Sequence, residues 1–388
     1  MAKLDHLLSN LSALAATPFE QATILPPEFY TSPKILALEK KHLFAAEWQC
    51  PGRAADIPNP GDYITYEIGG EPIFIIRGKD GSIRAFSNTC RHRMMQLLEG
   101  SGTVKRVVCP YHSWAYDLGG QLVGAPHSNY YQNFDKASIC LPEIRTEIWQ
   151  GFIYVTLNED AASLGDRLTP LSDLIDRYCM ADYVPLVTED HVWNTNWKLL
   201  TENYMESYHL PFIHKGTVGG HFPVEECIFP DDSPETFTYS TFTKAEGSIY
   251  GRAHPDNTHL EGAWRYTNVL PTIFPSHMFT VAPDYMWYLS LAPQGTGQVR
   301  IRYGASIAPE VVAAMTDRDA EMAAATAFLD EVNNEDRHVV EAAYRGALAP
   351  LTTPGPIHQL ERGIHHFIIY LAGRLAGGDT HGVQEAAE

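Results

Sequence analysis

The sequence predicts an α+β protein made of a small antiparallel β-domain followed by a larger mixed domain. Two observations support this. Residues 49–155 hold short runs of alternating apolar and polar residues, such as YITYEI and PIFIIRG, separated by glycine and proline turns. Beyond residue 160, helices flank runs of strands instead of alternating with single strands, which favours α+β over βαβ repeats. No GxGxxG or P-loop motif follows a strand, so a dinucleotide- or ATP-binding site has no support.

Composition and charge narrow the function classes. The chain has 388 residues, 45% hydrophobic and 19% charged, which is typical of a folded protein of two or three domains. Asp and Glu outnumber Lys and Arg by 47 to 28, giving a formal net charge of −19. Because such a surface repels phosphates and anionic lipid heads, we expect no nucleic acid and no membrane partner. The chain has no long apolar run, a start that is poor as a signal peptide and six dispersed cysteines, which together predict a cytoplasmic location.

The elements follow in order along three segments. Residues 1–44 are expected to form a helical segment that packs on the catalytic domain, since five leucines between residues 4 and 14 recur at helical spacing and 32–47 is also helical in pattern. Residues 45–155 form the β-domain, and residues 156–388 form the mixed domain. Periodicity predicts the elements of the mixed domain in this order: helix 197–209, strands 236–248 and 285–307, helix 309–346, and helix 364–375, ending at glycines 377–378.

The first chemical motif lies in the β-domain, in the stretch NTCRHRMMQLLEGSGTVKRVVCPYHSW. Cys90 and His92 form Cys-x-His, and after 16 residues Cys109 and His112 form Cys-x-x-His. Thiolates and imidazoles in this mixture suit structural zinc or a Rieske [2Fe–2S] cluster, in which two cysteines bind one iron and two histidines the other. Zinc ribbons place two cysteines on each knuckle, whereas here each loop carries one Cys and one His, which favours the cluster.

These residues resemble the Rieske domain of the Rieske non-haem iron oxygenases, the ring-hydroxylating oxygenase alpha-subunit family. The resemblance covers residues 45–150 and rests on CRH at 90–92, CPYH at 109–112, the following Ser-Trp pair and a Gly-x-Leu hairpin. Met94 departs from the family, where many members have glycine. The resemblance implies an antiparallel β Rieske domain beside a helix-flanked, helix-grip-like antiparallel-sheet catalytic domain. It also implies a Rieske-type [2Fe–2S] cluster bound by Cys90, His92, Cys109 and His112, with a mononuclear Fe(II) elsewhere.

A second motif, ENYMESYHLPFIHKG, places His209 and His214 five residues apart. Side chains at this spacing do not share one face of an unbroken helix, but Pro211 provides a break, so His209 can end the helix while His214 folds back. Two histidines and one carboxylate bind Fe(II) facially and leave coordination positions open. Residues 196–214 are similar to the mononuclear iron motif of the same family.

Glu206 occupies the position at which the family has a carboxylate that bridges two subunits. The resemblance implies that Glu206 connects His209 to a cluster histidine, His112, of the next subunit, and therefore that the oligomer is a ring, with a homotrimer expected. A carboxylate that hydrogen-bonds to a ligating histidine also orients the ring and raises its basicity.

The third iron ligand is expected among the acids of FLDEVNNEDRHVVEA. The family often has an acidic pair there whose second member ligates, which predicts Asp336. Asp330 and Glu335 are the alternatives, and the remaining acids, such as Glu331, would be exposed charges.

Electrons must come from a partner, because the chain has no flavin or nicotinamide motif. We expect a separate NAD(P)H-dependent reductase of the flavin or ferredoxin type, with Arg91, Arg93, Lys105 and Arg106 as candidate docking residues. O2 and a small organic molecule would be the substrates, which makes the chain the terminal oxygenase component, an oxidoreductase. A pure electron carrier would not need residues 156–388, and a zinc-stabilised binding protein would leave the second histidine pair without a role.

The substrate is predicted by resemblance alone. Glu206 within ENYMESYH, the length and the ending LERGIHHFIIYLAGRL are similar to the branch acting on quaternary ammonium compounds such as glycine betaine, carnitine and stachydrine, which implies N-demethylation or C-hydroxylation. The alternative is hydroxylation or dihydroxylation of an aromatic or heteroaromatic carboxylate. Aromatic residues expected to surround a trimethylammonium group by cation–π attraction are Tyr204, Tyr208, Phe212, Trp264 and Tyr266.

Overall fold

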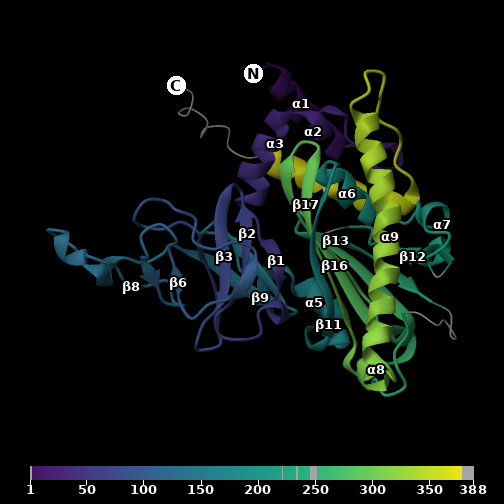
Figure 1. Cartoon of the computed structure of the whole chain (residues 1–388). Coiled ribbons are helices and arrows are strands. Elements are labelled where there is room, and N and C mark those ends of the chain that lie inside the picture. The colour runs from purple at the N-terminus through teal and green to yellow at the C-terminus, as the bar shows by residue number, and fades with distance from the viewer. Residues whose placement is uncertain (1, 221, 233–234, 245–250, 378–388) are drawn as a thin grey trace. The chain divides into compact units, whose positions relative to one another are not determined.

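The structure, a computed structural model, describes residues 2–220, 222–232, 235–244 and 251–377. Its contacts divide the chain into two compact units, which Figure 1 shows as ribbons. The smaller unit comprises residues 44–169, and the larger unit comprises residues 1–43 and 170–388. Each unit has its own sheet and is described by itself.

The smaller unit is built on an antiparallel seven-stranded sheet in the order β1-β10-β9-β4-β3-β2-β5. Strand β3 carries four consecutive buried residues, so both of its faces are covered, whereas β2 alternates. A three-stranded sheet, β6-β7-β8, lies beside the motif loops. The strands are β1 (Gln49–Arg53), β2 (Asp62–Ile68), β3 (Glu71–Arg77), β4 (Ile83–Ser87), β5 (Ser101–Thr103), β6 (Val107–Val108), β7 (Ala115–Tyr116), β8 (Leu122–Gly124), β9 (Glu143–Trp149) and β10 (Phe152–Thr156).

One apolar core joins the two sheets of the smaller unit. Phe74 and Phe86 from β3 and β4 pack in the same cluster as Tyr116 from β7, and both Cys90 and Cys109 belong to it. The loops that carry the Cys–His motifs are therefore anchored on the core rather than projecting from it.

The larger unit contains an antiparallel seven-stranded sheet in the order β11-β17-β16-β15-β14-β13-β12. Its long strands β16 and β17 form a hairpin in which Tyr285 pairs with Ile307 and Trp287 with Ala305. The strands are β11 (Val184–Trp193), β12 (Cys227–Ile228), β13 (Phe237–Thr243), β14 (Thr267–Ile273), β15 (His277–Val281), β16 (Tyr285–Gly295) and β17 (Gln298–Ile307).

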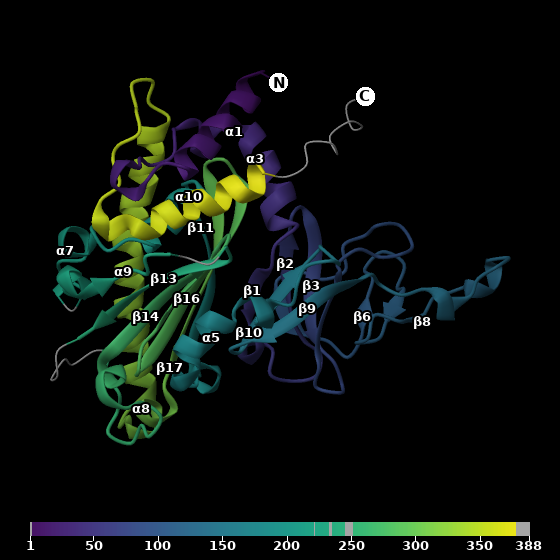
Figure 2. The same ribbon diagram turned by 180° about the vertical axis from the view of Figure 1, so that it is seen from behind.

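Helices cover this sheet. The longest helix, α9, runs along one face in Figure 1, and α10, which packs on α1, lies in front when the molecule is turned in Figure 2. Nearly all of α10 is buried, as its apolar pattern predicts. Helix α4 (Leu164–Arg167) belongs to the smaller unit, where it packs on β9. The other helices are α1 (Ala2–Ala15), α2 (Glu28–Thr31), α3 (Pro33–Glu39), α5 (Thr169–Ile175), α6 (Trp197–Tyr204), α7 (Leu210–Ile213), α8 (Pro309–Ala314), α9 (Arg318–Ala347) and α10 (Arg362–Leu375).

Two buried acids tie the N-terminal segment to α6. Lys198 Nζ donates to Glu39 Oε1 at 2.5 Å, with both side chains 1% exposed. The Tyr30 hydroxyl lies 3.0 Å from each carboxyl oxygen of Glu202, and burial raises the pKa of Glu202 to about 8 despite Tyr30 and Lys198. Glu202 is therefore mainly protonated at neutral pH, which lets it share a proton with Tyr30 without placing an isolated charge in the core.

The predicted helix 309–346 is two helices, α8 and α9, and the last helix ends at Leu375. Part of the predicted strand 236–248 and Gly378 lie outside the described residues. Within the described part of the chain, no helix has the length and apolarity needed to cross a membrane.

Candidate metal centres

The prediction of one helix over 197–209 is wrong, and the difference shapes the site. Helix α6 ends at Tyr204, and residues 205–209 form a link to the short helix α7. Pro211 has no N–H that could donate to the Ser207 carbonyl and continue the helix. The Ser207 N–H donates outside the helix, to Leu360 O at 3.1 Å. His209 therefore precedes α7 and His214 follows it, so one short turn carries both imidazoles.

His209, His214 and Asp336 meet at one point. Each offers a ligand atom within 4.8 Å of the other two. Asp336 Oδ1 lies 3.2 Å from His214 Nε2 and 3.6 Å from His209 Nε2. Two imidazoles and a carboxylate converging through Nε2 and Oδ1 form the 2-His-1-carboxylate set that suits Fe(II) and leaves positions open.

The other nitrogen of each imidazole faces a second carboxylate. His209 Nδ1 contacts Glu206 Oε1, and the His209 backbone N–H donates to Glu206 Oε2 at 3.1 Å. His214 Nδ1 lies 2.7 Å from Glu335 Oε2, which also accepts from the Thr217 hydroxyl at 2.6 Å. A carboxylate on Nδ1 fixes the tautomer that presents Nε2 as the ligand atom and holds the ring orientation.

The electrostatics of His214 follow from this arrangement. Its side chain is 2% exposed, and burial by itself lowers the imidazole pKa, but Asp336 and Glu335 outweigh burial and raise it. A divalent cation at the triad would balance the charge of these carboxylates, and the imidazole that binds it would be neutral.

The acids of α9 divide by position. Asp336 belongs to the triad, and its neighbour Glu335 lies on the outer nitrogen of His214. Asp330 is instead near Tyr303, whose pKa it raises after the larger effect of burial. Glu331 is exposed.

The loop that follows His214 needs glycine at residue 219, since a Cβ there would lie 2.4 Å from Leu210 O.

The two Cys–His loops of the smaller unit have the same backbone pattern. The Cys90 N–H donates to the oxygen of residue 95, and the Met94 N–H donates to Cys90 O; Cys109 makes the corresponding bonds with residues 114 and 113. Met94 and Ser113 hold equivalent positions with φ of 56° and 57°. A left-handed conformation favours glycine, so Met94 accepts backbone strain at this position.

The four side chains of these loops converge, and within the described part of the chain the two imidazoles lack a partner at Nδ1. The rings of His92 and His112 are 4.7 Å apart, and neither Nδ1, although buried, has a hydrogen-bond partner within the described chain. Cys90 and Cys109 are buried, and burial raises the pKa of the Cys109 thiol. Two thiols and two orphaned imidazole nitrogens fit a Rieske cluster, which would take all four.

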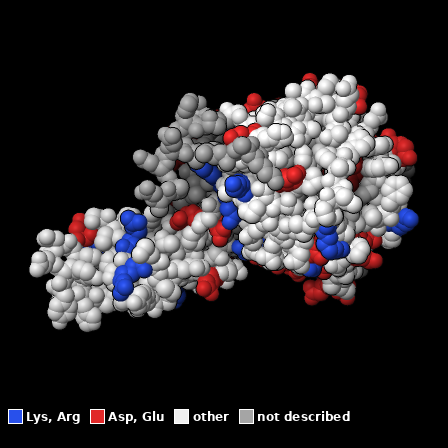
Figure 3. All heavy atoms as spheres, turned by 90° about the horizontal axis from the view of Figure 1, so that it is seen from above, with Lys and Arg blue, Asp and Glu red and all other residues white. Residues whose placement is uncertain are grey.

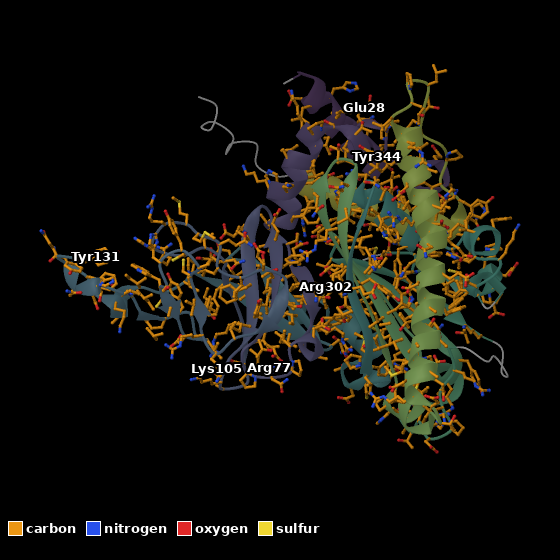
Figure 4. All side chains as sticks on the ribbon, viewed as in Figure 1. Glu28, Arg77, Lys105, Tyr131, Arg302 and Tyr344 are labelled. Carbon is orange, nitrogen blue, oxygen red and sulfur yellow. The ribbon has the colours of Figure 1, made fainter. Side chains whose placement is uncertain are left out.

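Neighbouring aromatic residues hold this arrangement. Trp114 stacks on His92 with 4.9 Å between ring centroids, and the Tyr116 hydroxyl lies 3.4 Å from Cys90 Sγ and accepts from the Arg91 N–H. Tyr131, labelled in Figure 4, places its hydroxyl 3.5 Å from His92 Nε2. Hydrogen bonds near a cluster sulfur are among the groups that tune its potential.

A cavity of about 690 Å³ lies next to the His209–His214–Asp336 triad. Of the five aromatic residues predicted to surround the substrate, only Tyr204 lines it. Tyr208 and Phe212 are 45% and 59% exposed, and Trp264 packs on Tyr178 and Arg177. The rings that do line it come from the sheet, α9 and the loop after α7: Trp193, Phe222, Phe242, Tyr285, Trp287, Tyr303 and Phe328.

Comparison with known proteins agrees with both halves of this description. The family model for the ring hydroxylating alpha subunit (catalytic domain) matches residues 180–377, and that for the Rieske [2Fe-2S] domain matches residues 47–135. The chain belongs to the ring-hydroxylating oxygenase alpha-subunit family. It is an oxidoreductase acting with O2, with a Rieske [2Fe–2S] domain and a catalytic domain that binds mononuclear iron, and Rieske oxygenases take electrons from a reductase partner.

Relatives within this Rieske oxygenase family give the comparison more detail. The carnitine monooxygenase oxygenase subunit of Acinetobacter baumannii is 37% identical over 265 residues, covering 68% of this chain and 69% of that protein. The glycine betaine monooxygenase oxygenase subunit of Chromohalobacter salexigens is 38% identical over 212 residues, covering 54% and 47%. A crystal structure of a quaternary ammonium Rieske monooxygenase with L-carnitine matches with a TM-score of 0.79 and 26% identity, over 94% of this chain and 98% of that one.

Sequence reasoning missed the role of Glu335 beside His214 and missed Thr217 altogether. Glu335 was a candidate ligand, but its place on His214 Nδ1 follows from how α9 faces the loop. Thr217 has no motif that would mark it, since its hydroxyl matters only through Glu335.

Proposed function

We propose that this Rieske oxygenase hydroxylates a quaternary ammonium compound at an N-methyl group or an adjacent carbon, using O2 and electrons from its reductase. The observation that carries the proposal is the lining of the cavity beside the triad. Apart from three tyrosines, its ionisable groups are four carboxylates and the two histidines, and the described lining residues include no Lys or Arg. A cation is favoured by such carboxylates and by aromatic faces, whereas a substrate carboxylate finds no counter-charge there.

Tyr204, two residues before Glu206, and Trp287 of β16 are an aromatic pair that lines the cavity. Their rings meet edge to face with centroids 5.6 Å apart, and the Tyr204 hydroxyl lies 3.1 Å from Thr280 Oγ1, which fixes the ring. A fixed aromatic surface beside Glu206 and Asp336 would hold a trimethylammonium group by cation–π and charge attraction. The names of the relatives support the same substrate class.

The residues would divide the chemistry as follows. Cys90, His92, Cys109 and His112 would hold the cluster. When bound, the cluster supplies single electrons and the iron activates O2 for insertion into a C–H bond. The ring of polar and apolar groups around the triad excludes bulk water and orients the substrate.

His209, His214 and Asp336 would hold the iron, and Glu206 would hold the proton on His209 Nδ1. Glu206 would also accept a hydrogen bond from His112 of the next subunit in a homotrimer, which requires a ring of three chains. Such a link keeps the two imidazoles in fixed orientation across the subunit boundary.

The reductase would dock on the smaller unit near the cluster loops. Arg91, Arg93, Lys105 and Arg106 are all exposed there, and Lys and Arg side chains are visible on that unit in Figure 3. Because the chain as a whole is acidic, these local positive charges would orient an acidic partner, and the rate of reduction should fall as salt screens them.

The test is substrate-stimulated consumption of NADH and O2 by iron-loaded protein with a surrogate reductase. Choline, carnitine, glycine betaine and proline betaine are compared with benzoate and salicylate. Stimulation by an ammonium compound, with formaldehyde or a hydroxylated product formed in proportion, is the expected result. Stimulation by the aromatic acids alone would refute the proposed substrate class and favour ring hydroxylation.

A further inference from the structure

The cavity extends far beyond the metal triad. Asp336 is at one end of the lining and Glu321 at the other, 15 residues apart on α9, which is roughly 22 Å at the helical rise of ~1.5 Å per residue. All lining residues of α9 follow one stripe at alternating spacings of three and one: Glu321, Ala324, Ala325, Phe328, Leu329, Val332, Asn333 and Asp336. One face of the helix therefore borders the cavity over about four turns.

The sheet opposite this stripe also lines the cavity in successive pairs. The cross-strand pairs Leu289–Tyr303, Trp287–Ala305 and Tyr285–Ile307 all contribute, and consecutive pairs are roughly 7 Å apart along the strands. The Ala308 N–H donates to Asp284 O at 2.9 Å, directly before α8. The Tyr285–Ile307 pair and Asp284 therefore mark the α8 end of the cavity.

The N-terminal half of α9 carries apolar side chains that the described part of the chain buries only partly. Among the described residues of the whole helix only Val332 and Val340 are buried, and Val340 lies in the C-terminal half. Phe328 and Leu329 are partly exposed although both line the cavity. Ala324, Ala325 and Ala305 leave space between helix and sheet. Continuity with the metal triad makes the substrate the occupant that would cover this surface.

The far end of the cavity presents a carboxylate. Asp284 Oδ2 accepts from the Gly251 N–H at 2.9 Å, while the buried Oδ1 has no hydrogen-bond partner within the described chain. Burial raises the pKa of Asp284 to about 6, and the ammonium of Lys244 opposes that rise, so the group is mainly ionised at neutral pH. Lys244 itself is held over the ring of Phe222, 4.0 Å from its centroid, and does not line the cavity.

We propose that the cavity binds an elongated ammonium compound, with the cationic head beside the triad, an apolar chain along α9, and a chain end without a carboxylate near Asp284. This rests on the proposed function and narrows its substrate class: short zwitterions such as carnitine would leave the α8 half of the cavity unfilled. Cavities of this size usually hold ligands well above the size of a short betaine.

The first test measures affinity along a chain-length series. Ethyl-, butyl-, hexyl- and octyltrimethylammonium are titrated into the iron-loaded enzyme by calorimetry, with substrate-stimulated O2 uptake as the second readout. Each methylene that enters the apolar cavity should tighten Kd by roughly fourfold, equivalent to ~0.8 kcal/mol. A variant of octyltrimethylammonium that carries a carboxylate at the far end of its chain should bind at least tenfold more weakly than octyltrimethylammonium itself.

A variant pair locates the effect on α9. Ala325→Phe fills the cavity between helix and sheet, and Ala323→Phe adds the same ring at an exposed position outside the lining. Ala325→Phe should abolish the gain in affinity from butyl to octyl, and Ala323→Phe should keep the wild-type gain. Iron content, measured for both variants, reports whether the triad is retained.

The outcomes separate this inference from the proposed function. Turnover of ammonium compounds with a Kd that does not change with chain length refutes the elongated substrate and leaves the proposed function intact. A chain-length effect for neutral alkylbenzenes but no binding of ammonium compounds refutes the proposed head group. Tighter binding of the carboxylate-ended chain would assign the far end to Lys244 rather than Asp284 and overturn that part.

Discussion

Replacing Asp336 and replacing its neighbour Glu335, both on α9, should have different effects on iron binding. Asp336 contributes to the triad, whereas Glu335 accepts from His214 Nδ1 and from Thr217. Asp336→Ala should lose mononuclear iron and keep the red-brown cluster, because two imidazoles alone make an incomplete site. Glu335→Ala should keep both metals at saturating iron but weaken the mononuclear site.

The size of the Glu335 effect follows from its contacts. His214 is 1% exposed, so removal of its acceptor leaves a buried N–H unsatisfied, at a cost of roughly 1–3 kcal/mol. Loss of an outer carboxylate on a metal-bound histidine typically weakens metal binding by about 10–100-fold. Glu335→Gln retains an oxygen acceptor for Nδ1–H and should recover much of the loss. Glu335→Met, which fills a similar volume without an acceptor, should not recover it, whereas a merely space-filling role would predict recovery by both.

The assay is iron content by mass spectrometry after dialysis against graded chelator, with the visible spectrum of the cluster as an internal standard. Glu331→Gln, an exposed acid on the same helix, is the matched control and should behave as wild type. Full iron and normal activity in Asp336→Ala would show that the third ligand is Asp330 or Glu335. Chelator curves for Glu335→Ala that overlie wild type would refute the positioning role.

The remaining predictions concern electron transfer and stability. Glu206→Gln should keep cluster and iron but lose coupled turnover, and normal product formation by that variant would rule out the bridging role. The pKa of Glu202 is about 8 in the folded protein against an ordinary 4.5. Its contribution to the free energy of unfolding is therefore complete below pH 4.5 and is lost as the pH rises through 8, by at most ~1.4 kcal/mol per pH unit. Denaturant unfolding of Glu202→Gln should lack this decline, and parallel curves for variant and wild type would contradict it. Glu39→Gln should cost about 3–5 kcal/mol by leaving Lys198 without its carboxylate, and adding Lys198→Met should recover part of that loss in the same unfolding assay; an unchanged midpoint would show that the pair is not strongly coupled.

Features with a strong local signal were predictable from the sequence. The strands around Ile73–Ile76 and the buried helix at 362–375 have apolar patterns that no other element can satisfy. The ligand candidates were also visible, because Cys90, His92, Cys109 and His112 carry chemistry in their spacing. Their meeting in space depends on two matched turns, in which Met94 and Ser113 have φ near +57°, and the sequence did not predict that conformation.

Features that depend on distant partners were not predictable. The helix through 197–209 has unbroken periodicity, but Ser207 bonds to Leu360, more than a hundred residues away, and the helix ends early. The aromatic lining was misjudged for the same reason. Tyr208 and Phe212 are near the histidines in sequence but face outward, while Trp287 reaches the cavity from a strand about 80 residues later.

Helix α9 explains how one element can serve both metal binding and substrate selection. Its C-terminal half is anchored: Val340 O accepts from the Thr195 hydroxyl at 2.8 Å, Glu341 Oε1 accepts from the Asn194 N–H at 3.0 Å, and Tyr344, near the upper end of the helix in Figure 4, contacts Thr296. Asp336 lies four residues before this anchored turn and is held in place by it. The N-terminal half has the cavity, not the sheet, beneath it. Residues there can therefore change the space offered to a substrate without moving the carboxylate of the triad, which confines specificity to one half of the helix and metal geometry to the other.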